Sequence, residues 1–309
     1  MILTITLNPS IDRRYNVDGF QLGSVFRAKE TQYTPGGKGI NVTKVVNQYK
    51  EDVCATGFLG GRAGDYIIES LDNLSIENKF TSISGETRSC ISILSEDSQT
   101  EVLEGGPEIS EKEFDSFIGG YKDLIKDTEY IAASGSLPKG LESNTYKKLI
   151  EIANKKGKKF LLDTSGEALE KGIEGKPFLI KPNEDELAAL LGKAIENEED
   201  LINGGKSLLD KGIEIVVISL GSEGSLVFND NTMYKVSIPQ VEVINPVGSG
   251  DAMIAGFLVG LKRGYGIEKL IKFASSSGTL NAMEAETGKV DPSKVEEIMK
   301  KINIESEKL

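Results

Sequence analysis

Short apolar segments alternate with helical segments along much of this 309-residue chain, and this alternation limits the fold more than any other feature. From about residue 108 onward, apolar runs such as 159–163, 178–181 and 215–220 are separated by stretches with helical periodicity. An uninterrupted apolar run indicates a strand covered on both faces, which is typical of parallel sheets flanked by helices. We therefore predict an α/β fold with a mostly parallel sheet, followed by helices over roughly 250–263, 266–285 and 291–303.

Two stretches depart from this rhythm. Residues from about 12 to 35 and from about 87 to 104 alternate apolar and polar side chains, with no helix between them. Alternation of apolar and polar side chains with a period of two indicates strands with one buried face, whose other face meets solvent or covers a ligand. The sequence thus predicts a β lid made of residues 12–35 and 87–104, inserted into an α/β body made of residues 1–11, 36–86 and 105–309.

The chain contains no histidine and only two cysteines, Cys54 and Cys90. Without imidazole there is no Ser-His or Cys-His dyad, no histidine base and no histidine-ligated metal. Two cysteines are too few for a four-cysteine metal site or a disulfide framework, so the expected location is the reducing cytoplasm. Any proton must be moved by a carboxylate, lysine, tyrosine or cysteine.

The formal net charge is −12, because 48 acidic side chains outnumber 36 basic ones. Nucleic acids and anionic membranes attract proteins that carry a positive field. The longest apolar stretch, 252–261, is too short to cross a bilayer. We therefore expect neither nucleic acid nor membrane as a partner, and an anionic ligand would need basic residues gathered at its own site.

The segment 245–256 begins with Asn-Pro and a run of small residues and continues as a predicted helix. The first N–H groups of a helix have no partners within it, so Gly248, Ser249 and Gly250 form a candidate anion site. Asp251 follows in the first turn, where a carboxylate can take a proton from a hydroxyl group while backbone donors stabilise a transferring phosphoryl group. The alternative is that Asp251 only complements the helix dipole as a cap.

Two further glycine clusters are candidate ligand sites. The segment 34–41 contains three glycines, which let a ligand approach the backbone, and also Lys38 and Asn41, which bind hydroxyl groups or charge. The segment 219–224 follows an apolar strand, and ligands of open α/β sheets bind at the carboxyl ends of strands. The alternative for 219–224 is an ordinary turn. The segment 248–253 is not a dinucleotide fingerprint, because Met253 stands in place of the third glycine, and 200–207 is not a P-loop, because Asp200 stands in place of the first glycine.

Basic side chains supply the local positive charge. Arg27 and Lys29 share one face of a lid strand predicted over 25–33, Arg88 opens the other lid piece, and Lys139 follows the run 135–138. Arginine suits two-pronged recognition of phosphate, so Arg27 and Arg88 are predicted to face one cleft. The alternative for each of these residues is a charged side chain that lies in solvent and binds no ligand.

Asn183 and Glu186 stand three residues apart at a predicted helix start, on one face of that helix. Their oxygens suit a hydrated Mg²⁺ ion. The alternative is a helix cap completed by a capping-box glutamate.

Six motifs occur in order along the chain, and together they resemble the PfkB, or ribokinase-like, family of sugar kinases. They are NPSID at 8–12, GGKGxN at 36–41, SGSLP at 134–138, KPNxxE at 181–186, SLGxxG at 219–224 and NPVGSGD at 245–251. The resemblance spans essentially the whole chain. It implies a doubly wound α/β body, a β lid over the sugar, Asp251 as general base, and Mg²⁺ held through water by Asn183 and Glu186. It places ATP against Lys181, Asn183, Glu186, Ser219, Gly221, Gly224 and Asn281.

Runs at 85–88, 100–107, 245–251 and 280–288 are most similar to the tagatose-6-phosphate kinase branch of this family, with the 1-phosphofructokinase branch as the alternative. Either branch implies a ketohexose monophosphate and ATP as substrates, with a monovalent cation and a homodimer through the lid as further expectations. The pair Arg13 and Arg14 departs from both branches, which usually have less charged residues there. The expected sugar-phosphate ligands are Asp12, Arg27, Gly37, Lys38, Asn41, Arg88, Ser136 and Lys139.

A function of a different class is a non-catalytic sugar-phosphate sensor on the same fold. Such a sensor would have lost the base or the anion site. Both are present in this sequence, which favours the kinase.

Overall fold

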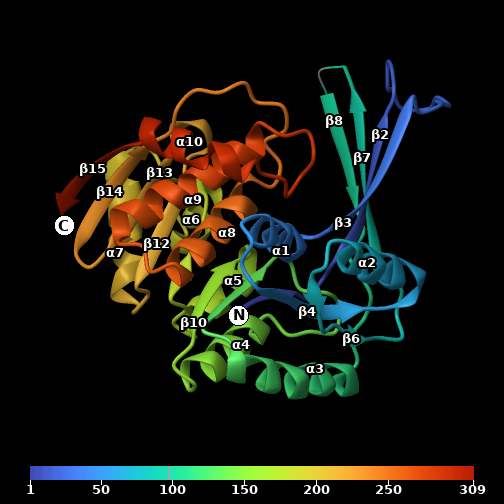
Figure 1. Ribbon diagram of the computed structural model, residues 1–309, viewed down its shortest axis with the longest axis horizontal. Coiled ribbons are helices and arrows are strands. Elements are labelled where there is room, and N and C mark those ends of the chain that lie inside the picture. The colour runs from blue at the N-terminus through green and yellow to red at the C-terminus, as the bar shows by residue number, and fades with distance from the viewer. Residues whose placement is uncertain (97) are drawn as a thin grey trace.

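The computed structural model describes residues 1–96 and 98–309, and its largest element is a mixed sheet of eleven strands within those residues (Figure 1). In chain order the strands are β1 (Ile2–Thr6), β4 (Val53–Leu59), β5 (Glu77–Asn78), β6 (Thr81–Ser82), β9 (Tyr130–Ser134), β10 (Lys159–Asp163), β11 (Leu179–Ile180), β12 (Ile215–Ser219), β13 (Ser225–Asn229), β14 (Thr232–Ser237) and β15 (Asn303–Lys308). They lie in the order β15-β14-β13-β12-β11-β10-β9-β1-β4-β5, and β6 pairs with β4.

The central strands β1, β4 and β9 to β12 pair in parallel, as their apolar runs predict. Strands β13, β14 and β15 extend the sheet in antiparallel fashion. Short turns join β12 to β13 and β13 to β14, as antiparallel pairing allows, whereas α8, α9 and α10 lie between β14 and β15 in the sequence.

Helices cover both faces of the sheet (Figure 1). Those within the described residues are α1 (Lys38–Gln48), α2 (Gly61–Asn73), α3 (Glu111–Leu124), α4 (Thr145–Asn154), α5 (Gly166–Ile173), α6 (Glu184–Leu191), α7 (Glu198–Asp210), α8 (Ser249–Lys262), α9 (Ile267–Ala282) and α10 (Val295–Lys301), with 3-10 turns at Ile125–Asp127, Gly221–Glu223 and Pro292–Lys294. Across the part of the chain that the structure describes, none of these helices has the length and apolar character needed to span a membrane.

Buried side chains form two cores, one on each face of the sheet. Ile2 and Leu161 pack with α1, α8, α9 and α10, whereas their neighbours Leu3 and Leu162 pack with α3, α4, α5 and α7. This alternation follows from the period of two along a strand. The doubly wound α/β fold is therefore confirmed.

The C-terminal tail differs from the prediction. Helices α8 and α9 lie where the sequence predicts them, but α10 ends at Lys301 and the strand β15 follows. This strand is a mostly exposed edge strand rich in charged side chains, which is how proteins protect sheet edges. Such a strand lacks the apolar run by which the inner strands are recognised.

The lid is a separate sheet of four strands that projects from the body (Figure 1). It has the order β3 (Glu30–Gly36), β2 (Ser10–Asn16), β7 (Arg88–Ser95) and β8 (Ser98–Leu103), in which β2 and β7 are parallel and the other neighbours antiparallel. Because β3 begins only at Glu30, the prediction that Arg27 and Lys29 lie on a strand is wrong. The division of the chain into lid and body domains at the predicted boundaries stays a prediction.

Candidate active site

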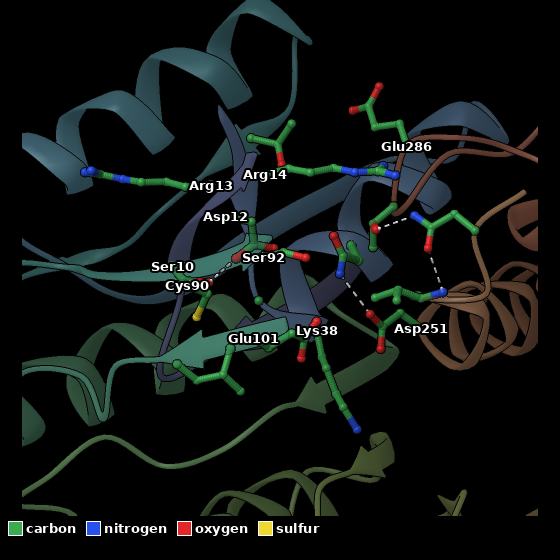
Figure 2. Close-up of a pocket in the computed structure, with 18 of the residues that line it drawn as sticks. Ser10, Asp12, Arg13, Arg14, Lys38, Cys90, Ser92, Glu101, Asp251 and Glu286 are labelled. Atoms are coloured by element: carbon green, nitrogen blue, oxygen red, sulfur yellow. Dashed lines mark hydrogen bonds between the residues drawn. The ribbon is translucent and has the colours of Figure 1, made fainter. Parts of the chain in front are cut away.

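A cavity of about 420 Å³ lies between the lid and the body, and we call it the lid cavity. Strands β2, β3, β7 and β8 line it from the lid side, and α1, the end of β10 and the start of α8 line it from the body. Figure 2 shows their side chains converging on one space. The predicted site residues found in it are Asp12, Gly37, Lys38, Asn41, Arg88, Lys181, Gly248, Gly250 and Asp251.

A second cavity, of about 800 Å³, lies beside the turn from β12 to β13 and against α8 and α9, and we call it the sheet-end cavity. Its apolar walls include Ile238, Val241 and Met253. Gly250 lines both cavities, so they meet at the N-terminus of α8. The predicted site residues that line the sheet-end cavity are Asn183, Ser219, Gly221, Gly224, Ser249 and Gly250.

The N-terminus of α8 has no side-chain cap. The Ser249 N–H donates to the Pro246 carbonyl at 3.3 Å, whereas the N–H groups of Gly250 and Asp251 lie at the open end of the helix, where they can meet a ligand. Gly248 precedes the helix with a φ of 87°, and a Cβ atom there would lie 2.6 Å from Cγ2 of Thr287. A Cβ atom on Gly250 would lie 3.0 Å from Nζ of Lys181. The two glycines therefore keep the helix end open and close to a cation, as an anion site requires.

Asp251, in the first turn of α8, is only 5% exposed and faces the lid cavity (Figure 2). Asn41 on α1 donates a hydrogen bond from Nδ2 to its Oδ2 at 2.9 Å. Burial raises the pKa of Asp251 to about 7, and the charge of Asp163 adds to this increase, while Lys38, the Asn41 hydrogen bond and Lys181 oppose it. A buried carboxylate with such a pKa is suited to take a proton at neutral pH.

Asp163 is a site residue that the sequence analysis missed. It ends β10, its side chain is 1% exposed, and it lines the lid cavity. Lys38 lies 3.6 Å from its Oδ2 and Lys181 lies 3.5 Å from its Oδ1. The sequence feature that could have identified Asp163 is its position at the carboxyl end of the apolar run 159–163, because parallel sheets bind ligands at the carboxyl ends of their strands.

The lid contributes Asp12 and Arg88 from neighbouring strands. Ser10 donates a hydrogen bond to Oδ1 of Asp12 at 2.7 Å, and burial raises the pKa of Asp12. Arg88 donates from Nε to the Asn8 carbonyl at 3.2 Å and from Nη1 to the Glu104 carbonyl at 2.9 Å. These bonds orient the guanidinium group at the cavity wall.

Three predicted sugar-phosphate ligands do not line the lid cavity of this chain. Arg27 lies in the segment between β2 and β3, outside both strands. The Ser136 hydroxyl accepts a hydrogen bond from Nδ2 of Asn8 at 3.1 Å, and Lys139 forms a backbone bridge with Glu108. Their predicted contacts with substrate stay predictions.

Arg14, one of the two arginines that depart from the family pattern, has a structural role in this chain. It reaches from the lid strand β2 to the body and donates from Nη1 to the Ala285 carbonyl at 3.0 Å. Arg13 instead lies over the ring of Tyr33, 5.7 Å from its centroid. In Figure 2 the two side chains point in opposite directions, with Arg14 extending toward Glu286. Arg14 thus ties the lid to the loop that follows α9.

Asn183 and Glu186 form a capping box at the start of α6. The Asn183 side chain accepts a hydrogen bond from the Glu186 N–H at 2.8 Å, and the Glu186 carboxylate accepts one from the Asn183 N–H at 3.0 Å. This is the alternative that the sequence left open, and a role with Mg²⁺ stays a prediction. Among the described residues, no group of three or more acidic or cysteine side chains is placed to hold a metal ion alone.

Asn281 does not line the sheet-end cavity, but it holds the loops next to it by hydrogen bonds. Its Nδ2 donates to the Val247 carbonyl at 2.9 Å, and its Oδ1 accepts from the Gly288 N–H at 2.9 Å. It therefore fixes the loops on both sides of the α8 N-terminus. Direct contact with ATP stays a prediction.

Comparison with known proteins gives one consistent result. The chain is 45% identical over 307 residues to the tagatose-6-phosphate kinase of Staphylococcus epidermidis strain ATCC 12228. The aligned region covers 98% of this chain and 99% of that protein. It is similar in structure to a possible 1-phosphofructokinase of Thermotoga maritima, with a TM-score of 0.91, 27% identity and full coverage of both chains. It is also similar to phosphofructokinase-2 of Escherichia coli, with a TM-score of 0.90, 25% identity and coverage of 97% and 98%.

The family model for pfkB family carbohydrate kinases matches residues 5–294, which include every element that forms the two cavities. A buried carboxylate and an uncapped helix end where two cavities meet are what a phosphoryl transfer to a hydroxyl group requires. The chain thus belongs to the pfkB family of carbohydrate kinases.

Proposed function

We propose that this kinase transfers the γ-phosphoryl group of ATP to D-tagatose 6-phosphate and forms D-tagatose 1,6-bisphosphate, a step of lactose and galactose catabolism. The observation that carries the proposal is the meeting of the two cavities at Gly250, beside the buried carboxylate of Asp251. The 45% identity to a tagatose-6-phosphate kinase supports the choice of sugar.

The sugar phosphate binds in the lid cavity. Asp12 and Asn41 offer a carboxylate and an amide to its hydroxyl groups, and Arg88 and Lys38 offer positive charge to its phosphate. We also assign to the phosphate Arg27, Ser136 and Lys139, which would have to approach from beyond the cavity wall. Gly37 also lines this cavity; its φ is 101°, and a Cβ atom there would lie 3.0 Å from Cγ2 of Thr6, so glycine lets the start of α1 pass close to the end of β1.

ATP binds in the sheet-end cavity, with its base against the apolar walls and its phosphates toward Gly250. Asp251 takes the proton of the acceptor hydroxyl, whose oxygen then bonds to the γ-phosphorus. The bond from that phosphorus to the β–γ bridging oxygen breaks and leaves ADP. Backbone N–H groups at 248–250 and Lys181 stabilise the charge on the transferring group.

A divalent ion fits the donor set at the start of α6, although that set is small. Glu186 uses its Oε2 atom in the capping box, and Asn183 lines the sheet-end cavity. These two residues would hold Mg²⁺ through water, since Mg²⁺ commonly keeps several waters and binds mainly to substrate phosphates. When bound, the ion neutralises charge on the β- and γ-phosphates.

An assay of ADP release that compares three acceptors tests the proposal. We expect the highest kcat/KM with tagatose 6-phosphate, above the values for fructose 6-phosphate and fructose 1-phosphate. A preference for fructose 1-phosphate would instead identify a 1-phosphofructokinase. Binding of sugar phosphate without any ADP release would point to the sensor function.

The pH dependence of the reaction should reflect Asp251. Its carboxylate must be unprotonated to accept a proton, and its pKa is raised to about 7. We therefore expect kcat/KM for the sugar to fall as pH decreases through about 7, approaching a tenfold loss per pH unit. A profile that stays flat down to pH 5.5 would contradict this assignment.

We also propose a homodimer through the lid. Leu22 and Val25, in the segment between β2 and β3, are 94% and 99% exposed, and Val102 of β8 is 55% exposed. Exposed apolar side chains on the projecting lid favour association with a second copy. A cytoplasmic location and a monovalent cation stay predictions.

A further inference from the structure

Asp163 is the most deeply buried carboxylate of the lid cavity. It lies at the end of β10 with its side chain 1% exposed, and neither of its oxygens has a hydrogen-bond partner among residues 1–96 and 98–309. A buried carboxylate without partners is costly, so the site must compensate its charge in another way. The compensation comes from two lysines.

The two lysines come from different elements and reach different oxygens. Lys38 begins α1, is 43% exposed at its side chain and lies 3.6 Å from Oδ2. Lys181 follows β11, is 7% exposed and lies 3.5 Å from Oδ1. Both lysines line the lid cavity, and Lys181 also lies against Gly250, where the two cavities meet, so Asp163 stands between them.

Both separations are longer than the 2.7–2.9 Å typical of charge-assisted hydrogen bonds. The lysines are thus attracted to Asp163 by charge and are not fastened to it by short hydrogen bonds. A phosphate oxygen that forms a short hydrogen bond to the ammonium group of a lysine can therefore replace the Asp163 carboxylate as the partner of that lysine. Asp163 itself stays anchored, because its backbone carbonyl accepts a hydrogen bond from the Gly135 N–H at 2.9 Å.

We propose that Asp163 is a positioning residue for phosphoryl transfer, which holds Lys38 and Lys181 beside Asp251 in the empty site and releases them to the incoming phosphates. This inference rests on the proposed function and assigns a role to a residue that the mechanism above does not use. Asp163 does not touch the reacting atoms and acts through the two lysines.

The same arrangement controls the proton affinity of the base. The negative charge of Asp163 raises the pKa of Asp251, whereas Lys38 and Lys181 lower it. Asp163 is also the largest cause of the raised pKa of Lys38, to which Asp251 and Glu186 contribute. The charge of Asp163 also acts on Tyr146 of α4, whose pKa is raised mainly by burial, so the phenol stays neutral. Without Asp163, two uncompensated ammonium groups would lower the pKa of Asp251 and weaken it as a base.

Two substitutions should move the pH profile in opposite directions. Asp163→Asn removes the negative charge and should shift the acid limb of kcat/KM to lower pH by about 1 unit. Lys38→Met removes a positive charge beside Asp251 and should shift the same limb to higher pH. KM for both substrates should rise in Asp163→Asn, because the lysines lose their position. A control with the same change of charge is Glu170→Gln, at an exposed position of α5, which should match wild type.

A second measurement does not depend on activity. Lysines carrying ¹³C-methyl groups can be titrated by NMR without substrates, with the Lys38 signal assigned through Lys38→Arg. We expect the pKa of Lys38 to fall in Asp163→Asn. If Asp163→Asn does not fold, as judged by thermal unfolding, the upward shift in Lys38→Met remains the test.

An unchanged Lys38 titration would overturn the proposed pairing. An acid limb that moves in the same direction in both variants, or in neither, would overturn the coupling to Asp251. A wrong proposed function would give a different set of results. Asp251→Asn would retain activity, or the wild-type protein would release no ADP, while the pKa of Lys38 would still fall in Asp163→Asn.

Discussion

Replacing Asp251 by Asn should lower kcat by about 10²- to 10⁴-fold, because the variant keeps the shape of the side chain but has no group that accepts the hydroxyl proton. Asn at this position can still meet the Asn41 amide, which lies 2.9 Å from Oδ2 in the native chain. The affinities for ATP and for the sugar phosphate, measured by calorimetry, should therefore change little. A loss confined to kcat is the signature of a group that acts in the transition state.

The matched control is Glu268→Gln, which removes another acidic side chain from the first turn of a helix, α9, at an exposed position. It should leave kcat unchanged. Wild-type turnover in Asp251→Asn would mean that the carboxylate only complements the dipole of α8, which is the alternative that the sequence left open.

Replacing Arg88 by Ala should mainly raise KM for the sugar phosphate, by about 10- to 100-fold. Hydrogen bonds to charged groups contribute about 1.5–3 kcal/mol, and each 1.4 kcal/mol is a factor of ten. The side chain is already oriented by the Asn8 and Glu104 carbonyls, so little order is lost when a phosphate binds to it. KM for ATP and kcat should change much less.

The control for Arg88→Ala is Arg62→Ala, at an exposed position of α2. A second comparison uses the sugar without its phosphate. Wild type should discriminate strongly between the two sugars, and Arg88→Ala should lose much of that discrimination. An equal KM for the sugar phosphate in wild type and variant would remove Arg88 from the phosphate site.

Local patterns in the sequence predict the body of the fold well. Continuous apolar runs identify the inner strands, because each is covered on both faces, as Leu161 and Leu162 illustrate by joining opposite cores. The edge strand β15 was missed because its exposed, charged residues carry no such run. The lid strand predicted over 25–33 was placed too early, since the alternation around residue 25 lies outside β3, which begins at Glu30.

Local motifs also predict much of the site, whereas contacts between distant residues cannot be read from them. The glycines at 248 and 250 and the carboxylate of Asp251 were recognised because they are adjacent in sequence. The contact of Arg14 with Ala285 joins residues 271 positions apart, and the position of Asp163 between two lysines depends on three separate elements. Asn183 and Glu186 were ambiguous because a cap and a metal site use the same oxygens.

The most direct test of the central claim is to identify the product by ³¹P NMR after the wild-type protein is incubated with D-tagatose 6-phosphate, ATP and Mg²⁺. We predict a new sugar-phosphate ester signal, at position 1 of the sugar, that grows in equal amount with ADP. Formation of ADP with inorganic phosphate only, or no reaction with this sugar while fructose 1-phosphate is converted, would contradict the account.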